Sequence, residues 1–190
     1  MIRQLRSAPN LLTLLRLVFI PFIVIAVVEN RYGLALGLFI AAGISDGLDG
    51  LLARLLKQKT LLGQYLDPIA DKLLLSTMFL VLAATHRGTI LVFATVLVFA
   101  RDIIILIVCT LLYITGTMKV FRPSLFGKAN TLAQIVTVPL VLLHEVSSAQ
   151  WIAVGRKVGI YATIALTVIS GVHYLVRVAF HLRHAGGDKQ

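Results

Sequence analysis

Apolar residues in this sequence form runs that each approach the length of a membrane-spanning helix. Hydrophobic residues make up 58% of the 190 residues. Charged residues make up 14%, roughly half the share found in a soluble domain. Because a helix needs about 20 residues to cross a bilayer, the pattern predicts an all-α integral membrane bundle. The six expected spans are Leu11–Val28, Leu34–Leu56, Leu62–Ala84, Ile90–Ile114, Leu125–Leu143 and Val158–Phe180.

Basic residues mark the gaps between these runs. The net charge of +10 is spread along the chain and is not gathered in one patch, which favours anionic lipid headgroups over nucleic acid as the partner. The bias of Lys and Arg between the two sides predicts that both termini are cytoplasmic. Residues 1–9 are expected to form a short interfacial helix. One domain is expected over residues 1–185, followed by a tail at 186–190.

Four aspartates interrupt the second and third runs, and they are half of the eight acidic residues in the chain. Asp46 and Asp49 are three apart, and Asp67 and Asp71 are four apart, so each pair shares a helix face. Two helices that meet on those faces would bring all four carboxylates together near the cytoplasmic surface. Such a cluster needs cations to offset its repulsion. Hard oxygen ligands favour Mg²⁺ or Mn²⁺ and a phosphate-bearing substrate.

The residues around these aspartates carry a family resemblance. The pattern Asp46-x-x-Asp49-Gly50-x-x-Ala53-Arg54, followed by Gly63-x-x-x-Asp67-x-x-x-Asp71, resembles the signature of the CDP-alcohol phosphotransferase family at every fixed position. Further segments are similar to its phosphatidylglycerophosphate synthase and cardiolipin synthase branch, and the last of them leans toward cardiolipin synthase. These segments are Pro9–Arg16, Leu66–Lys72, Ala100–Asp102 and Gly127–Thr131.

The resemblance implies a reaction in which a CDP-linked lipid, usually CDP-diacylglycerol, donates its phosphatidyl group to an alcohol and CMP leaves. It implies two divalent ions, with Asp46, Asp49 and Asp67 as ligands. Asp71 would lie close to the second ion and act as the general base. Gly50, Ala53 and Arg54 would contact the nucleotide and its phosphates. A homodimer in a bacterial inner membrane is implied as well.

Other polar residues are candidates for substrate binding. Asn10, Thr13 and Arg16 share a helical face and would line the nucleotide end, or else form a hydrogen-bonded seam or a snorkelling Arg. Arg101 lies in an apolar span and is a candidate for the acceptor phosphate, although an ion pair involving Asp102 would also explain it. Lys128 and Arg122 would complete an anionic pocket, or would be ordinary cytoplasmic loop charges.

Glycerol 3-phosphate is the expected acceptor, and phosphatidylglycerol is the alternative. A cation transporter or channel is the alternative from a different functional class. A transporter requires polar residues through the whole membrane depth, whereas segments such as Phe19–Val28 and Leu73–Leu82 are almost wholly apolar. Carboxylates gathered on one side fit a surface cavity better than a pore.

Overall fold

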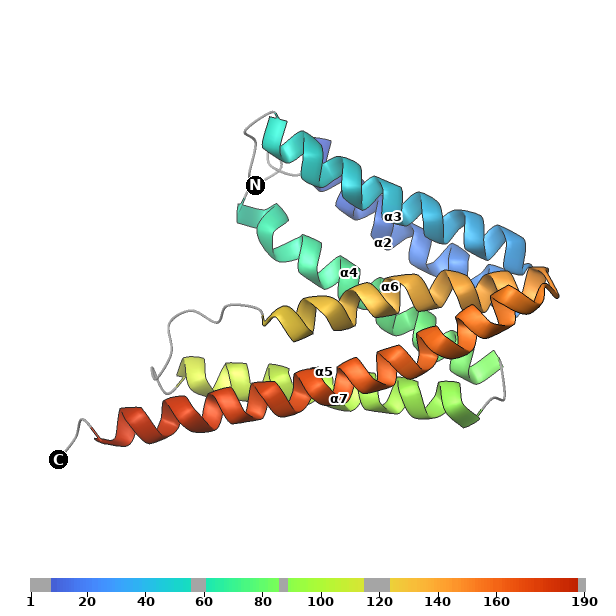
Figure 1. The fold of residues 1–190 in the computed structure, drawn as a ribbon. Helices are drawn as coiled ribbons and strands as arrows, with labels where there is room; N and C mark the ends of the chain where they lie inside the picture. Colours follow the sequence, from blue (N-terminus) through green and yellow to red (C-terminus); the bar gives the residue numbers. More distant parts are fainter. Residues whose placement is uncertain (1–7, 56–60, 86–88, 115–123, 188–190) are drawn as a thin grey trace.

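The structure is a computed structural model that describes residues 8–55, 61–85, 89–114 and 124–187. These residues form an all-helical chain with no strand among them, as the sequence predicts (Figure 1). The helices are α2 (Ala8–Val28), α3 (Tyr32–Leu55), α4 (Leu61–Thr85), α5 (Thr89–Ile114), α6 (Leu125–Val146) and α7 (Gln150–Gly187).

The helix bounds follow the apolar runs closely in the first five helices and depart from them in the last. Helix α7 has 38 residues and extends beyond both ends of the expected span, Val158–Phe180. It continues through residues 186 and 187, which were expected in the tail; the division into a domain and a tail stays a prediction. The expected interfacial helix falls mostly outside the described residues, of which the first, Ala8, already belongs to α2.

The outer surface of the bundle is apolar. Large side chains such as Phe22, Val96 and Leu106 are more than half exposed, which suits contact with lipid tails better than contact with water. Within the described residues, three helices are long and apolar enough to cross a membrane, and two helices contain shorter apolar stretches. The three are the helical stretches Leu91–Val108, Leu125–Val146 and Gln150–Phe180. The fold is therefore a membrane helical bundle.

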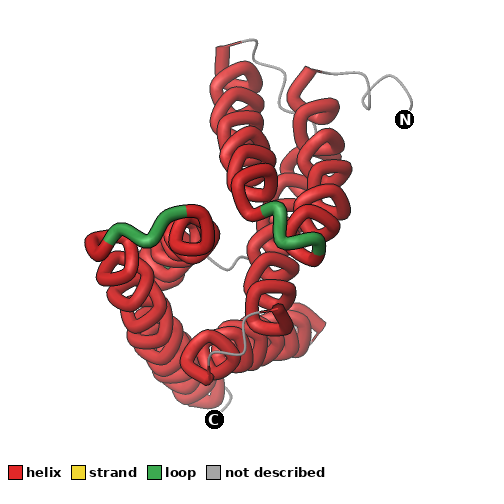
Figure 2. The backbone as a smooth tube through the Cα atoms, turned by 90° about the vertical axis from the view of Figure 1, so that its right-hand side faces the viewer, coloured by secondary structure: helices red, strands yellow, loops and turns green. Residues whose placement is uncertain are grey.

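The helices pack in two groups that α4 and α6 connect. Helix α2 packs on α3 and α4, and α7 packs on α5 and α6; α4 also contacts α5 and α6, and α3 contacts α6. Figures 1 and 2 show α2 and α3 side by side, with α5 and α7 on the far side of the bundle. The main buried cluster draws on all the described helices and includes Ile23, Val27, Phe39, Met78, Phe79, Leu82, Leu91, Val138, Leu142 and Ile160.

Polar and small residues fix how α6 and α7 meet. The hydroxyls of Thr137 and Thr163 are 3.1 Å apart across the interface. A Cβ on Gly159 would lie only 2.8 Å from the Thr137 hydroxyl oxygen, so this glycine permits the close approach that membrane helices use. At the start of α6, the Ser124 hydroxyl accepts a hydrogen bond from the Gly127 backbone N–H at 3.0 Å, which is a helix N-cap. These contacts set the position of the polar residues in the first turns of α6.

Candidate active site

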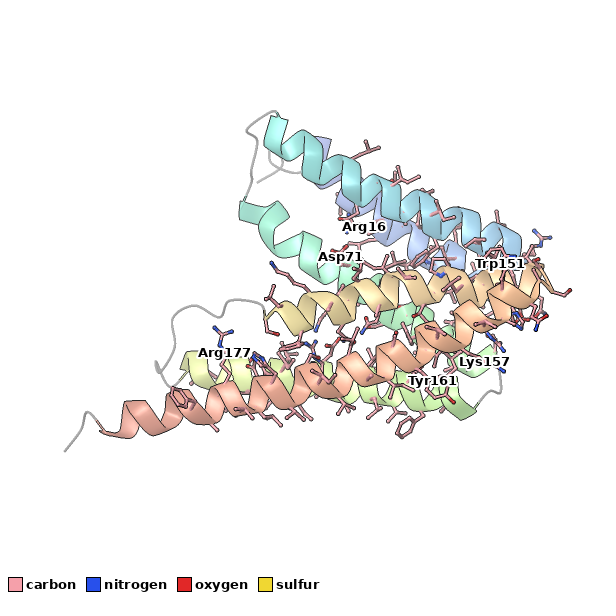
Figure 3. The ribbon with its side chains drawn as sticks, viewed as in Figure 1. Arg16, Asp71, Trp151, Lys157, Tyr161 and Arg177 are labelled. Atoms are coloured by element: carbon pink, nitrogen blue, oxygen red, sulfur yellow. The ribbon has the colours of Figure 1, made fainter. Side chains whose placement is uncertain are left out.

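A fully buried arginine joins three helices at the centre of the candidate site. Arg16 on α2 has no exposed side-chain surface, whereas Asp46 on α3 and Asp71 on α4 are 45% and 43% exposed. One guanidinium nitrogen of Arg16 donates to Asp46 Oδ1 at 2.5 Å, and the other donates to Asp71 Oδ1. Arg16 and Asp71 lie close together in Figure 3. A buried arginine is costly unless it is paired, so its position requires these carboxylates.

The two aspartate pairs predicted from the sequence are thus represented here by one member each. Asp46 and Asp71 come from different helices and reach the same cationic group. The backbone of Asp49 and Asp67 lies in α3 and α4, but their side chains fall outside those that the structure describes. Among the side chains it does describe, no group of three or more metal-ligating residues lies together. The four-carboxylate metal site stays a prediction.

A cavity of about 120 Å³ lies against these charged groups. Its charged wall is made by Arg16, Asp46 and Asp71, and the rest is apolar or small: Phe39, Ala42, Gly43, Leu74, Leu75 and Ile135. A cavity with a charged end and an apolar wall suits an amphiphile whose polar part carries phosphate and whose other part is hydrocarbon.

A second, smaller cavity of about 40 Å³ also has Asp71 in its wall. Most of the residues that line it are polar or charged, and they come from α4, α5 and α6: Asp71, Lys72, Leu75, Ser76, Arg101, Asp102, Asn130, Thr131 and Gln134. Asp71 and Leu75 belong to the walls of both cavities. A group bound in the larger cavity and a group bound in the smaller one would therefore meet at the Asp71 carboxylate.

Two cations, Lys72 and Arg101, and two carboxylates, Asp71 and Asp102, line the smaller cavity. Asp102 accepts from Arg101 at 2.7 Å and lies 3.1 Å from the Lys72 ammonium. Two positive groups thus share one carboxylate. The ion pair considered for Arg101 forms with Asp102, its neighbour in the sequence. Lys72, on α4, contacts the same Asp102 from another helix. The Arg101 Nε is buried and has no hydrogen-bond partner among the residues that the structure describes. An anionic group bound here would satisfy it.

The first turn of α6 presses against Arg101. A Cβ on Gly127 would lie 3.2 Å from the Arg101 Nη2, so the glycine leaves room for the guanidinium. The N-terminal end of a helix carries partial positive charge, and here it adds to that of Arg101. Two positive features in contact favour an anion such as a phosphate between or beside them.

The other residues predicted to bind substrate differ in whether they line a cavity of the described structure. Arg101 lines the smaller cavity, but Lys128 is exposed and is not part of the wall of that cavity. Arg122 lies outside the described residues, so its role stays a prediction. The proposed nucleotide contacts lie in helices α2 and α3, but their side chains are outside those described: Asn10, Thr13, Gly50, Ala53 and Arg54.

The sequence analysis assigned no role to five polar residues of the smaller cavity, which are Lys72, Ser76, Asn130, Thr131 and Gln134. A signal for two of them was present. Asn130 and Gln134 are four residues apart in an apolar segment, so they share a helix face, and polar residues inside a span are usually functional or paired. Lys72 follows Asp71 directly, but sequence spacing does not indicate that it reaches α5.

Comparison with known proteins places this geometry in a family. The family model described as CDP-alcohol phosphatidyltransferase matches residues 6–176. A CDP-diacylglycerol–glycerol-3-phosphate 3-phosphatidyltransferase of Haemophilus influenzae is 32% identical, covering 89% of this chain and 91% of the relative. A probable phosphatidylglycerophosphate synthase of Mycobacterium tuberculosis is 34% identical, covering 98% and 87%. The CMP-forming cardiolipin synthase of Rattus norvegicus is 32% identical, covering 74% and 51%.

The match spans the helices that carry Arg16, Asp46, Asp71 and Arg101, and it extends to most of α7. The two bacterial relatives match over most of their length. The chain therefore belongs to the CDP-alcohol phosphatidyltransferase family and is an enzyme of that class.

Proposed function

We propose that this enzyme transfers the phosphatidyl group of CDP-diacylglycerol to glycerol 3-phosphate and releases CMP. The observation that carries the proposal is the position of Asp71 in the walls of both cavities. The larger cavity suits the lipid-linked donor because its wall is largely apolar with a charged end. The smaller cavity suits a small phosphorylated alcohol because Arg101 and Lys72 line it. The names of the bacterial relatives support the same two substrates.

The family depends on divalent metals in general, and the residues present fit such ions. Asp46 and Asp71 already converge on one cationic group, the Arg16 guanidinium, so their hard oxygens are placed to share a cation. We assign two ions, Mg²⁺ or Mn²⁺, to Asp46, Asp49, Asp67 and Asp71. When bound, such ions neutralise a diphosphate and stabilise the charge that develops on it during transfer.

The protein's own groups would then act on the acceptor. The Asp71 side chain is 43% exposed and belongs to the wall of the smaller cavity, so we assign it the role of accepting the proton of the attacking hydroxyl. Arg101 and Lys72 would hold the acceptor phosphate. The acceptor oxygen forms a bond to the phosphorus that carries diacylglycerol, and the bond from that phosphorus to the CMP oxygen breaks. By family resemblance, Asn10, Thr13, Gly50, Ala53 and Arg54 would hold the nucleotide.

Arg16 and Asp71 lie in the first halves of α2 and α4, nearer the end of the bundle where these helices begin. Helices α2, α4 and α6 begin at that end, and α7 ends there (Figure 1). This arrangement supports termini on one side of the membrane, and the distribution of Lys and Arg supports the cytoplasmic side. We assign the active site to the cytoplasmic face of a bacterial inner membrane. Assembly as a homodimer rests on the family resemblance.

Phosphatidylglycerol is the second candidate acceptor, which would make the product cardiolipin. The segment Gly127–Thr131 favours it by resemblance, and the cardiolipin synthase of Rattus norvegicus supports it by name. Both acceptors offer a primary hydroxyl near a phosphate, so the same base and the same cations would serve either one.

Purified enzyme supplied with CDP-diacylglycerol and Mg²⁺ or Mn²⁺ tests these assignments. Glycerol 3-phosphate, phosphatidylglycerol, inositol phosphate and serine are offered separately, and CMP release and the lipid product are measured. We expect phosphatidylglycerophosphate as the product, and no CMP release in excess chelator. Cardiolipin as the main product would identify phosphatidylglycerol as the acceptor in place of glycerol 3-phosphate. Undiminished turnover in chelator would refute the metal assignment.

A further inference from the structure

Two buried amide side chains in the smaller cavity have free hydrogen-bonding groups. Asn130 and Gln134 are 1% and 6% exposed, one turn apart on α6. Among the described residues, the side-chain hydrogen bond found for Asn130 is at its Oδ1, and none is found at its NH₂ group or at the Gln134 amide. Both residues belong to the wall of the cavity beside Asp71. A buried polar group without a partner is costly, so these two amides are suited to a polar ligand.

The orientation of the Asn130 amide is held from the opposite helix. The Thr167 hydroxyl on α7 donates to Asn130 Oδ1 at 2.9 Å, and both side chains are buried. The Asn130 carbonyl oxygen is therefore occupied, and its NH₂ group remains available as a donor. Gln134 supplies an acceptor and two donors close by. Together the two amides can both donate to and accept from a ligand group.

These amides are chemically distinct from the rest of the cavity. Lys72, Arg101 and Asp102 are charged, and the two cations suit a phosphate. Neutral amides suit a hydroxyl, which donates one hydrogen bond and accepts others. Glycerol 3-phosphate and the glycerol headgroup of phosphatidylglycerol share one feature that requires such a contact. Each keeps a secondary hydroxyl on the carbon next to the one that carries the attacking primary hydroxyl.

We propose that Asn130 and Gln134 bind the secondary hydroxyl of a glycerol acceptor, with Thr167 as the positioning residue for Asn130. This inference rests on the proposed function and names the acceptor feature that the smaller cavity recognises. The site would bind the secondary hydroxyl while Asp71, in the same wall, takes the proton from the adjacent primary hydroxyl. Selectivity for glycerol acceptors over simple alcohols follows, because an acceptor without that hydroxyl leaves both amides unpaired.

An acceptor that lacks only the secondary hydroxyl tests the proposal. The pair is glycerol 3-phosphate and 3-hydroxypropyl phosphate; the lipid pair is phosphatidylglycerol and phosphatidyl-1,3-propanediol. In the wild-type enzyme we expect kcat/KM to favour the glycerol member by about 10- to 100-fold. Asn130→Ala and Gln134→Ala should lower kcat/KM for the glycerol member by a similar factor and change the deoxy member by less than about threefold. The ratio between the two acceptors should therefore approach one.

The positioning role of Thr167 has its own readout. Thr167→Val should reduce the acceptor ratio because the Asn130 amide is free to turn, and Thr167→Ser should restore it because the hydroxyl is retained. Thr163→Val is the matched control, since it removes another buried hydroxyl of the same α6–α7 interface without touching the cavity wall. We expect it to change thermal stability and leave the ratio unchanged.

The outcomes are separable from those of the proposed function. If neither glycerol acceptor supports CMP release, the proposed function fails and this inference fails with it. If one of them supports CMP release, that acceptor is compared with its own deoxy counterpart. The active pair shows whether the recognised glycerol belongs to glycerol 3-phosphate or to the headgroup of phosphatidylglycerol. Equal losses for both members of that pair in Asn130→Ala and Gln134→Ala would overturn the hydroxyl assignment while leaving the proposed function intact.

Discussion

Replacement of Arg16 by Gln should destabilise the metal-free protein and leave a defect that divalent ions repair. Arg16 is fully buried and pairs with Asp46 and Asp71. Removing one partner of a fully buried ion pair costs roughly 3–5 kcal/mol. The two carboxylates here are 45% and 43% exposed, so solvent would recover part of that cost. We expect the free energy of unfolding to fall by about 2–3 kcal/mol.

Thermal unfolding in detergent measures this loss. For a chain of 190 residues, a change of 1 kcal/mol shifts Tm by about 2–4 °C, so Arg16→Gln in excess chelator should melt roughly 4–12 °C below wild type. Added Mg²⁺ or Mn²⁺ should reduce the difference in Tm between Arg16→Gln and wild type. An ion that binds the folded state stabilises it, and here it would replace the missing positive charge between the two carboxylates. The gain in Tm from the ion should therefore be larger in the variant than in wild type.

Arg31→Gln is the matched control. Arg31 pairs with Glu29 at 3.3 Å, but the two side chains are 67% and 52% exposed, and exposed pairs contribute about 0–1 kcal/mol. Its Tm should stay near that of wild type with or without metal. A Tm for Arg16→Gln equal to that of wild type in chelator would refute the stabilising role of the buried ion pairs. A gap that divalent ions leave unchanged would remove Asp46 and Asp71 from the metal assignment.

Two further predictions concern turnover. Asp71→Asn should lower kcat by about 10²-fold or more, the scale of losing a general base, while the Kd for CDP-diacylglycerol, measured by equilibrium binding, should suffer less than in Asp46→Asn. If the two variants weaken CDP-diacylglycerol binding equally, Asp71 is primarily a metal ligand and its assignment as the general base is wrong. Arg101→Ala should raise the KM for glycerol 3-phosphate about tenfold with little change in the KM for CDP-diacylglycerol, because it removes a charge-assisted contact. Lys128→Ala should have a smaller effect, because Lys128 lies outside the cavity wall; the opposite order in steady-state kinetics would move the acceptor phosphate to another site.

The order and type of the helices could be read from the sequence because burial in lipid leaves few choices. A chain whose apolar runs approach the thickness of a bilayer must satisfy its backbone hydrogen bonds internally, and helices do so. The limits of the runs therefore lie near the ends of most helices. Helix α7 is the exception, since its 38 residues continue past the apolar run and no Pro or strong cap stops it there.

The chemistry of the aspartates was also readable, because spacing within one helix fixes which side chains share a face. Asp46 and Asp49 are three residues apart and therefore share a helix face. A cluster of carboxylates in an apolar chain is costly and is usually functional. The same reasoning left Arg16 undecided between a snorkelling residue and a polar contact. A helix in isolation does not specify which neighbour its faces meet.

Contacts between helices were decided only by the tertiary structure. The pairing of Arg16 with Asp46 and Asp71 joins α2, α3 and α4, and the contact of Lys72 with Asp102 joins α4 and α5. Each depends on the rotation and crossing of helices, which side-chain packing sets and local periodicity does not. The sequence by itself therefore determined the helices, the acidic motif and the family. The packing of α4, α5, α6 and α7 determined which neutral and cationic side chains share a cavity with Asp71, because those residues are far apart in the chain and meet only when the bundle forms.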